Sequence, residues 1–227
     1  MANSITRSIP NTLTCCNLLS GCMAAIAAFN GDAWTALLWI CAGALFDFCD
    51  GFAARLLKAY SPLGKELDSL ADLVTFGLAP SILCWKTLSP LCEGYGPLAY
   101  IGFIIVVFSA LRLAKFNTDE RQTTSFMGLA VPADALFWAG LLQPECYQYI
   151  KQGPWVIIVL AVVFALLMVS DIPMFSLKFK SLKFSENRFR FIFIAGVILI
   201  MVLLGKSGIP AVICWYILLS ILTKGQH

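Results

Sequence analysis

The apolar residues of this chain fall into eight runs that carry almost no charge, separated by short polar segments. Apolar stretches near 20 residues are long enough to cross a bilayer as a helix. The pattern predicts an all-α, polytopic membrane helix bundle with about eight transmembrane helices. The expected spans are 8–31, 33–46, 67–85, 98–111, 131–142, 155–169, 191–204 and 209–222. In the first span, Pro10 and Asn11 indicate that the helix begins near Thr12.

The amino-acid composition also indicates that the protein is surrounded by lipid. Hydrophobic residues make up 59% of the 227 residues and charged residues 13%, whereas soluble domains carry about 25% charge. The mean hydropathy is +0.83. Eight spans leave only short loops, so we expect residues 1–227 to form a single transmembrane domain. A net charge of +3 is too small to indicate nucleic-acid binding, and nine cysteines without C-x-x-C exclude a disulfide scaffold.

The basic residues are unevenly distributed between the two sides of the predicted bundle. Eight spans place both termini on the same side. If the termini are cytoplasmic, every lysine and arginine except Lys86, Lys151 and Lys206 falls in a segment on the cytoplasmic side. Positive charge marks the cytoplasmic side of membrane proteins. We therefore expect an integral protein of a bacterial inner or plasma membrane, with both termini cytoplasmic.

Four acidic residues gather at the inner ends of the second and third predicted helices: Asp47, Asp50, Asp68 and Asp72. An aspartate at mid-membrane costs about 2.5–3.5 kcal/mol on insertion scales, so such a group needs a cation or a watery cavity. Spacings of three and four residues put each pair on one face of its helix. A short turn at Ser61-Pro62 would fold the helices antiparallel and bring the two pairs together.

Converging carboxylates repel one another unless a cation lies between them. Oxygen ligands favour Mg²⁺, Mn²⁺ or Ca²⁺, and two such ions suit a displacement at phosphorus. Gly51 and Gly64 leave room for a ligand, and Arg55 can fork onto a phosphate. A solvated cluster of helix ends is the plainer alternative. An ion transporter is another, but it predicts a midplane site and two matching halves, which the sequence does not show.

These positions resemble a known signature. The pattern Asp47-x2-Asp50-Gly51-x2-Ala54-Arg55-x8-Gly64-x3-Asp68-x3-Asp72 is similar, without a departure, to that of the CDP-alcohol phosphotransferase family. The resemblance implies a helical membrane fold, usually a homodimer, in which an acceptor hydroxyl displaces CMP from a CDP-lipid or CDP-alcohol. It implies that the four aspartates hold two divalent ions, Mg²⁺ or Mn²⁺, that Asp72 is also the general base, and that Gly51, Ala54, Arg55 and Gly64 border the CDP group.

Other segments narrow the resemblance. Residues 9–14, with Asn11 and Thr14, followed by Asn17 and Gly21, resemble the family's first helix, which reaches the nucleotide. Residues 112–118, residues 125–133 and the basic 173–190 linker resemble bacterial and archaeal members that act on serine. The resemblance then implies CDP-diacylglycerol and L-serine as substrates, with membrane lipids as surroundings.

Free serine brings a carboxylate, so its site needs a cation. Arg112 and Lys115, three residues apart, are the candidates, with Asn117 assisting. Both cations would also suit glycerol phosphate or inositol phosphate as acceptors, and an archaeal ether-lipid donor with serine stays open. Alternatively, both side chains extend to lipid headgroups. Asp134, in the fifth span, either contributes to the cavity or is a helix-start residue.

Overall fold

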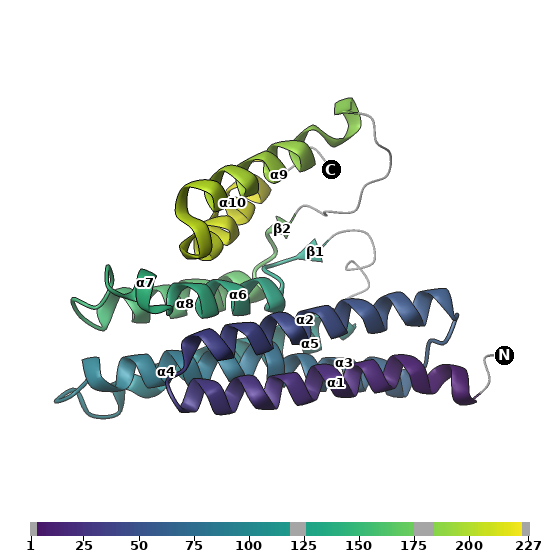
Figure 1. Cartoon of the computed structure of the whole chain (residues 1–227), viewed down its shortest axis with the longest axis horizontal. Coiled ribbons are helices and arrows are strands. Elements are labelled where there is room, and N and C mark those ends of the chain that lie inside the picture. The colour runs from purple at the N-terminus through teal and green to yellow at the C-terminus, as the bar shows by residue number, and fades with distance from the viewer. Residues whose placement is uncertain (1–3, 119–125, 175–183, 224–227) are drawn as a thin grey trace.

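The computed structural model describes residues 4–118, 126–174 and 184–223 as a layered helical bundle (Figure 1). The all-α prediction is confirmed, since the described strands are only two residues long and form one antiparallel pair. The elements are α1 (Ser4–Phe29), α2 (Ala33–Leu56), α3 (Pro62–Asp72), the π-helical turn η1 (Leu73–Leu78), α4 (Ala79–Leu91), the 3₁₀ segment η2 (Gly96–Phe103), α5 (Ile104–Thr118), β1 (Phe126–Met127), α6 (Val131–Leu141), α7 (Pro144–Tyr147), α8 (Trp155–Val169), β2 (Pro173–Met174), α9 (Phe184–Leu204), the 3₁₀ turn η4 (Gly205–Gly208) and α10 (Ile209–Leu222).

The predicted spans correspond to these helices. Five described stretches are long and apolar enough to cross a membrane, at 8–29, 33–56, 62–91, 96–118 and 187–222, and α6 and α8 are shorter apolar helices. The last stretch contains two helices, because α9 and α10 are joined by η4. The expected bounds 155–169 and 209–222 are those of α8 and α10.

Several helices are longer than the apolar pattern predicts. The expected start of the first helix near Thr12 is wrong, because α1 runs through Pro10. Pro10 is the seventh residue of α1, so it removes one intrahelical hydrogen bond without ending the helix. The third helix begins at Pro62 rather than near residue 67, since the Ser61 hydroxyl accepts a 3.0 Å hydrogen bond from the Gly64 amide and proline suits the first helical position.

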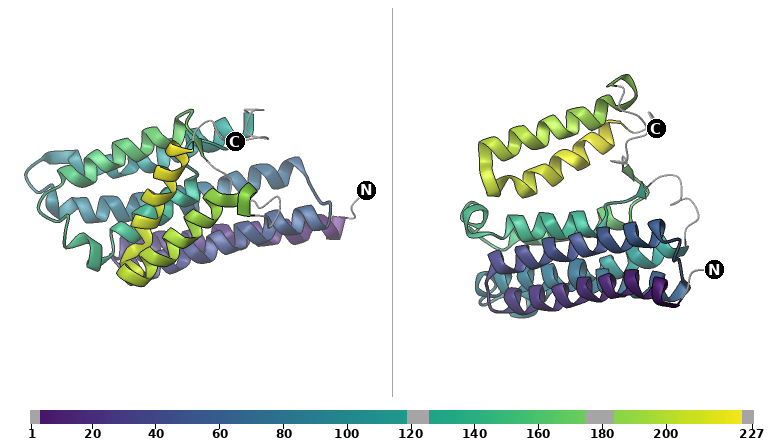
Figure 2. Two further views of the ribbon diagram at one scale, coloured as in Figure 1. Left: turned by 90° about the horizontal axis from the view of Figure 1, so that it is seen from above. Right: turned by 45° about the vertical axis from the view of Figure 1, so that its right-hand side comes forward.

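The long helices of the core run roughly parallel to the long axis of the molecule, and the α9–α10 hairpin is tilted from it (Figures 1 and 2). The start of α1 and the α2–α3 turn lie at one end, on the right of Figure 1, and the β1–β2 pair lies nearer the middle. The α1–α2 turn, the end of α4 and α7 lie at the other. The α9–α10 hairpin forms an outer layer over α6 and α8, as the right-hand view of Figure 2 shows.

Small buried side chains let α1 and α2 approach closely. Ala24 and Ala28 on α1, and Ala36 and Ile40 on α2, are fully buried. Small residues at such contacts are typical of membrane helices, where close van der Waals packing drives association. Deeper in the bundle, the rings of Phe137 and Phe164 stack with centroids 3.8 Å apart.

The helix that carries Asp68 and Asp72 widens immediately after Asp72. Residues Leu73–Leu78 form a π-helical turn, a feature common at functional sites. Within it, Thr75 is fully buried and lies between Gly21 of α1 and Gly43 of α2. A Cβ on Gly21 would come within 2.8 Å of the Thr75 backbone. Glycine is therefore required for α1 to pass this turn.

Candidate functional site

Three of the four predicted carboxylates form a cluster. Asp47 and Asp50 of α2 and Asp68 of α3 each place a carboxylate oxygen within 4.8 Å of the others. The Asp68 Oδ1 atom is buried and has no hydrogen-bond partner among the described residues. A group of acceptor-only oxygens, one of them unpaired, matches the ligand chemistry of a hard divalent cation. The cluster therefore fits the metal that the sequence predicts.

The hydroxyl of Thr14 holds one member of this cluster. Its Oγ1 atom donates a 2.6 Å hydrogen bond to Asp50 Oδ2. Thr14 is 3% exposed and Asp50 is 5% exposed, so this bond is shielded from water. The first helix thereby orients a carboxylate that the second helix supplies.

Asp72 lies outside the cluster, one helical turn beyond Asp68. It is 8% exposed, and its Oδ1 accepts a 3.0 Å hydrogen bond from Asn17 Nδ2. It is still close enough for its charge to interact with those of Asp47 and Asp68. The structure thus separates a three-carboxylate cluster from a fourth carboxylate that is held by an amide.

A pocket of about 450 Å³ opens beside the cluster, within the size range of small-molecule sites. All six residues that the resemblance assigns to the CDP-lipid line it, together with the three clustered aspartates. Asp72 does not. The lining residues are Pro10, Asn11, Thr14, Asp47, Phe48, Asp50, Gly51, Ala54, Arg55, Ala59, Tyr60, Ser61, Gly64, Lys65 and Asp68.

The two signature glycines have different surroundings. A Cβ on Gly51 would meet nothing within 4 Å, so Gly51 leaves open space in the pocket wall. A Cβ on Gly64 would lie 3.1 Å from Asn11 Oδ1, so Gly64 lets α3 pack on α1. Arg55 is exposed and uses only its Nε, which donates to the Gly51 carbonyl at 3.0 Å. The rest of its guanidinium makes no hydrogen bond or ion pair with the described residues.

Arg112 is a buried cation near Asp72. It lies in α5, is 7% exposed, and its guanidinium stacks on the Phe116 ring at 4.9 Å. Its charge is within electrostatic range of that of Asp72, but within the described part of the chain it forms no hydrogen bond or salt bridge. Burying such a group unpaired is costly. The arrangement provides a forked donor for an anion.

Lys115 and Asn117, the other two predicted acceptor residues, are bonded to the protein. Lys115 Nζ donates to Asp171 Oδ1 and to the Val169 carbonyl, both at 3.0 Å. It thereby neutralises the C-terminal end of α8. Asn117 Nδ2 donates to Ser69 Oγ at 2.8 Å. Of the three, Arg112 alone has no hydrogen-bonded or ionic partner among the described residues.

Three residues of the site carry no separate signal in the sequence analysis. Phe48, Tyr60 and Lys65 line the pocket, and their helical positions beside the signature residues are the only indication of this.

Asp134 is fully buried in α6, and neither carboxylate oxygen has a hydrogen-bond partner among the described residues. It is not among the residues that line the pocket. Ser125 and residues 175–183 of the resembling segments lie outside the described residues.

Comparison with known proteins agrees with this geometry. The family model described as CDP-alcohol phosphatidyltransferase matches residues 7–223. The relatives include three proteins with the name CDP-diacylglycerol–serine O-phosphatidyltransferase. The Bacillus subtilis protein is 39% identical over 55% of this chain and 69% of its own length. The Methanocaldococcus jannaschii protein is 35% identical over 73% and 70%. The Helicobacter pylori protein is 33% identical over 56% of this chain, and the match spans about half of that relative, 54%.

Proposed function

The chain belongs to the CDP-alcohol phosphatidyltransferase family, and we propose that it transfers the phosphatidyl group of CDP-diacylglycerol to the hydroxyl of L-serine, with release of CMP. The names of its relatives support serine as the acceptor. The observation that carries the proposal is Arg112, a buried guanidinium within electrostatic range of Asp72 that has no hydrogen-bonded or ionic partner among the described residues. A carboxylate-bearing acceptor would supply the missing anion.

The pocket is the proposed site of the CDP group. Asn11, Thr14, Ala54 and Gly64 border it, Gly51 leaves space for it, and the free end of the Arg55 guanidinium binds a phosphate. Asp47, Asp50 and Asp68, with Asp72 beside them, would hold two divalent ions, Mg²⁺ or Mn²⁺. When bound, these ions neutralise the pyrophosphate and stabilise CMP as the leaving group.

Asp72 is the proposed general base. Its carboxylate takes the proton of the serine hydroxyl as that oxygen attacks the lipid-bearing phosphorus. The bond between this phosphorus and the CMP oxygen breaks, and the electron pair leaves with CMP. Arg112 binds the serine carboxylate through two donors and directs the hydroxyl toward Asp72. Lys115 and Asn117 support this segment through Asp171 and Ser69.

The surroundings of the site are part of the proposal. We place the protein in the cytoplasmic membrane as one catalytic domain, with the site and both termini toward the cytoplasm. The support is the excess of basic residues on that side. The homodimer is proposed from the family resemblance alone.

Acceptor specificity is tested with purified protein, CDP-diacylglycerol and Mn²⁺, by following CMP release with serine, glycerol 3-phosphate or inositol phosphate. We expect CMP release with serine and formation of phosphatidylserine. The Arg112→Gln variant should lose serine-dependent release. Arg188→Gln is a matched control, because the Arg188 guanidinium also stacks on a ring, 4.7 Å from Phe189. Release with a phosphorylated acceptor but not with serine would overturn the assignment.

A further inference from the structure

Asn17 is a buried amide in an apolar helix, and its one side-chain hydrogen bond goes to the proposed base. It is 0% exposed, and its Nδ2 lies 3.0 Å from Asp72 Oδ1. Its Oδ1 has no hydrogen-bond partner among the described residues. Leaving a buried polar atom unpaired is destabilising, so an apolar side chain of similar size would pack this position better. The amide is therefore poorly explained by packing.

The surroundings of Asn17 fix its side chain in one orientation. Thr75 Oγ1, in the π-helical turn after Asp72, donates a 3.0 Å hydrogen bond to the main-chain carbonyl of Asn17, which holds the backbone at this position. A Cβ on Gly43 would lie 2.9 Å from Asn17 Oδ1, so α2 closes the other side. An ionised carboxylate only accepts hydrogen bonds, which directs the NH₂ group of the amide toward Asp72. Helix α1 and the π-helical turn thus hold the donor in place.

We propose that Asn17 is a positioning residue for Asp72, which fixes the carboxylate through Oδ1 and leaves Oδ2 for the acceptor hydroxyl. This bond is the only hydrogen bond of the Asp72 side chain within the described part of the chain. The inference rests on the proposed function in one respect, that Asp72 is the base. Asn17 lies outside the set that lines the pocket, so its effect should fall on turnover rather than on binding of the CDP-lipid.

The test compares Asn17→Leu and Asn17→Ser with Gln143→Leu in the full chain. Gln143 is a matched control, because it is a 2% exposed amide whose Nε2 also donates hydrogen bonds, to the carbonyls of Ala33 and Ala139, and whose Oε1 is also unpaired. It follows α6, at the end of the bundle away from the site. Leucine keeps the bulk of either amide and removes the donor. Serine is small enough to fold at position 17 and too short to reach Asp72.

We expect both Asn17 variants to lower kcat by about 10²-fold, the usual effect of a misplaced catalytic group, with the KM values for serine and CDP-diacylglycerol unchanged. Asn17→Leu and Gln143→Leu should change thermal stability by similar amounts, and Gln143→Leu should keep its kcat. Wild-type kcat in either Asn17 variant, or a kcat loss in Gln143→Leu equal to that in Asn17→Leu, would overturn the proposal. Wild-type turnover with serine in the same assay reports separately on the proposed function.

Discussion

Arg112 and Lys115 lie one turn apart on α5 but have different surroundings. Arg112 is buried and has no bonded partner among the described residues, whereas Lys115 is paired with Asp171. Arg112→Lys keeps the charge and loses the fork. A hydrogen bond to a charged group contributes about 1.5–3 kcal/mol, so we expect the KM for serine to rise roughly 10- to 100-fold. The KM for CDP-diacylglycerol should change little.

The Lys115→Ala variant is the comparison for this prediction. Its lost bonds go to α8, so it should lower thermal stability more than serine affinity. Steady-state kinetics with each substrate varied in turn separates the two effects. An unchanged serine KM in Arg112→Lys would place the acceptor carboxylate elsewhere.

Asp72 and the clustered aspartates should respond differently to loss of charge. Asp72→Asn keeps the shape and one acceptor oxygen, which can still receive the Asn17 hydrogen bond, but the amide cannot take a proton. We expect turnover to be abolished while CDP-diacylglycerol still binds, as measured by calorimetry on detergent-solubilised protein. Substantial turnover at saturating Mn²⁺ would remove Asp72 as the base.

The carboxylate cluster should make activity dependent on a divalent ion. Three carboxylate oxygens within 4.8 Å repel one another when ionised, and a bound cation removes that repulsion. EDTA should abolish CMP release, and Mn²⁺ or Mg²⁺ should restore it. Mn²⁺ binding, followed by electron paramagnetic resonance, should be lost in Asp68→Asn and kept in Asn117→Ala. Full activity after metal stripping would contradict the metal site.

At the scale of the helix, Gly21 and Gly51 have opposite roles. Alanine raises helix propensity over glycine by about 1 kcal/mol, which should stabilise Gly51→Ala because its Cβ meets nothing. At Gly21 the new Cβ would overlap the Thr75 backbone, and overpacking costs about 1–3 kcal/mol. We therefore expect Gly21→Ala to lower the thermal midpoint. Gly51→Ala should keep or raise it while weakening CDP-diacylglycerol binding, because the methyl group enters the pocket. A stabilised Gly21→Ala would show that this contact is loose.

The sequence predicts the bounds of a helix well where an unbroken apolar run defines them. It predicts them less well where polar contacts or close packing define them. The bounds of α8 and α10 follow from unbroken apolar runs. The continuation of α5 to Thr118 does not, because its last turns are polar and are held by bonds to α3 and α8. The π-helical turn after Asp72 has no periodicity signal of its own, since it depends on the packing of Thr75 between Gly21 and Gly43.

The candidate site also divides into features that residue spacing predicts and features that tertiary contacts decide. The spacing of the aspartates and the Ser61-Pro62 turn predict that all four carboxylates converge. Asp47, Asp50 and Asp68 do meet, but Asp72 lies outside their cluster. Spacing does not reveal that Asp72 is set apart by Asn17, because that contact joins residues 55 positions apart. Nor does spacing distinguish Arg112 from Lys115, because Lys115 is held by Val169 at the end of α8 and by Asp171 just beyond it.

The proposed site lies at one end of the bundle, which we call the polar end. The carboxylate cluster and the pocket lie toward the α2–α3 turn, where α1 also begins (Figure 1). At the opposite end, Lys206 lies 3.5 Å from Glu145 and stacks over the Trp34 ring at 4.3 Å. This contact fixes the α9–α10 hairpin to the core far from the site. A substrate with a charged head and a lipid tail would therefore enter from the membrane face that borders the polar end.

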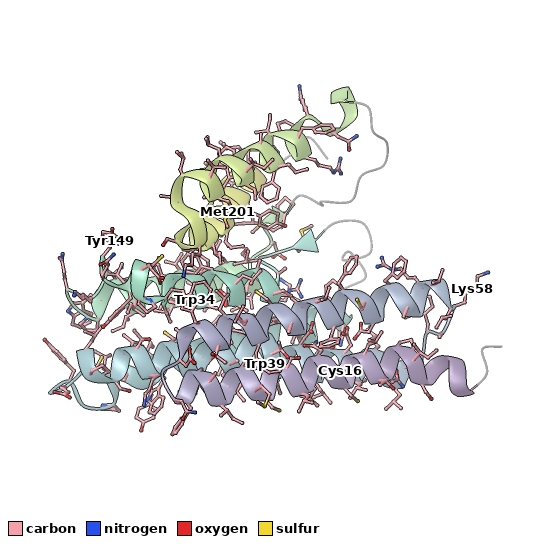
Figure 3. All side chains as sticks on the ribbon, in the orientation of Figure 1. Cys16, Trp34, Trp39, Lys58, Tyr149 and Met201 are labelled. Carbon is pink, nitrogen blue, oxygen red and sulfur yellow. The ribbon has the colours of Figure 1, made fainter. Side chains whose placement is uncertain are left out.

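The polar end should face the cytoplasm, because the basic residues gather on that side of the predicted spans. Lys58 and Tyr149 mark the two ends of the bundle (Figure 3). Both are exposed, and Tyr149 is 76% exposed, whereas the native Cys92 is buried and unsuitable as a probe. In a chain whose nine cysteines are replaced, Tyr149→Cys should react with an impermeant maleimide in intact cells. Lys58→Cys should react only after lysis, and the reverse pattern would invert the proposed orientation.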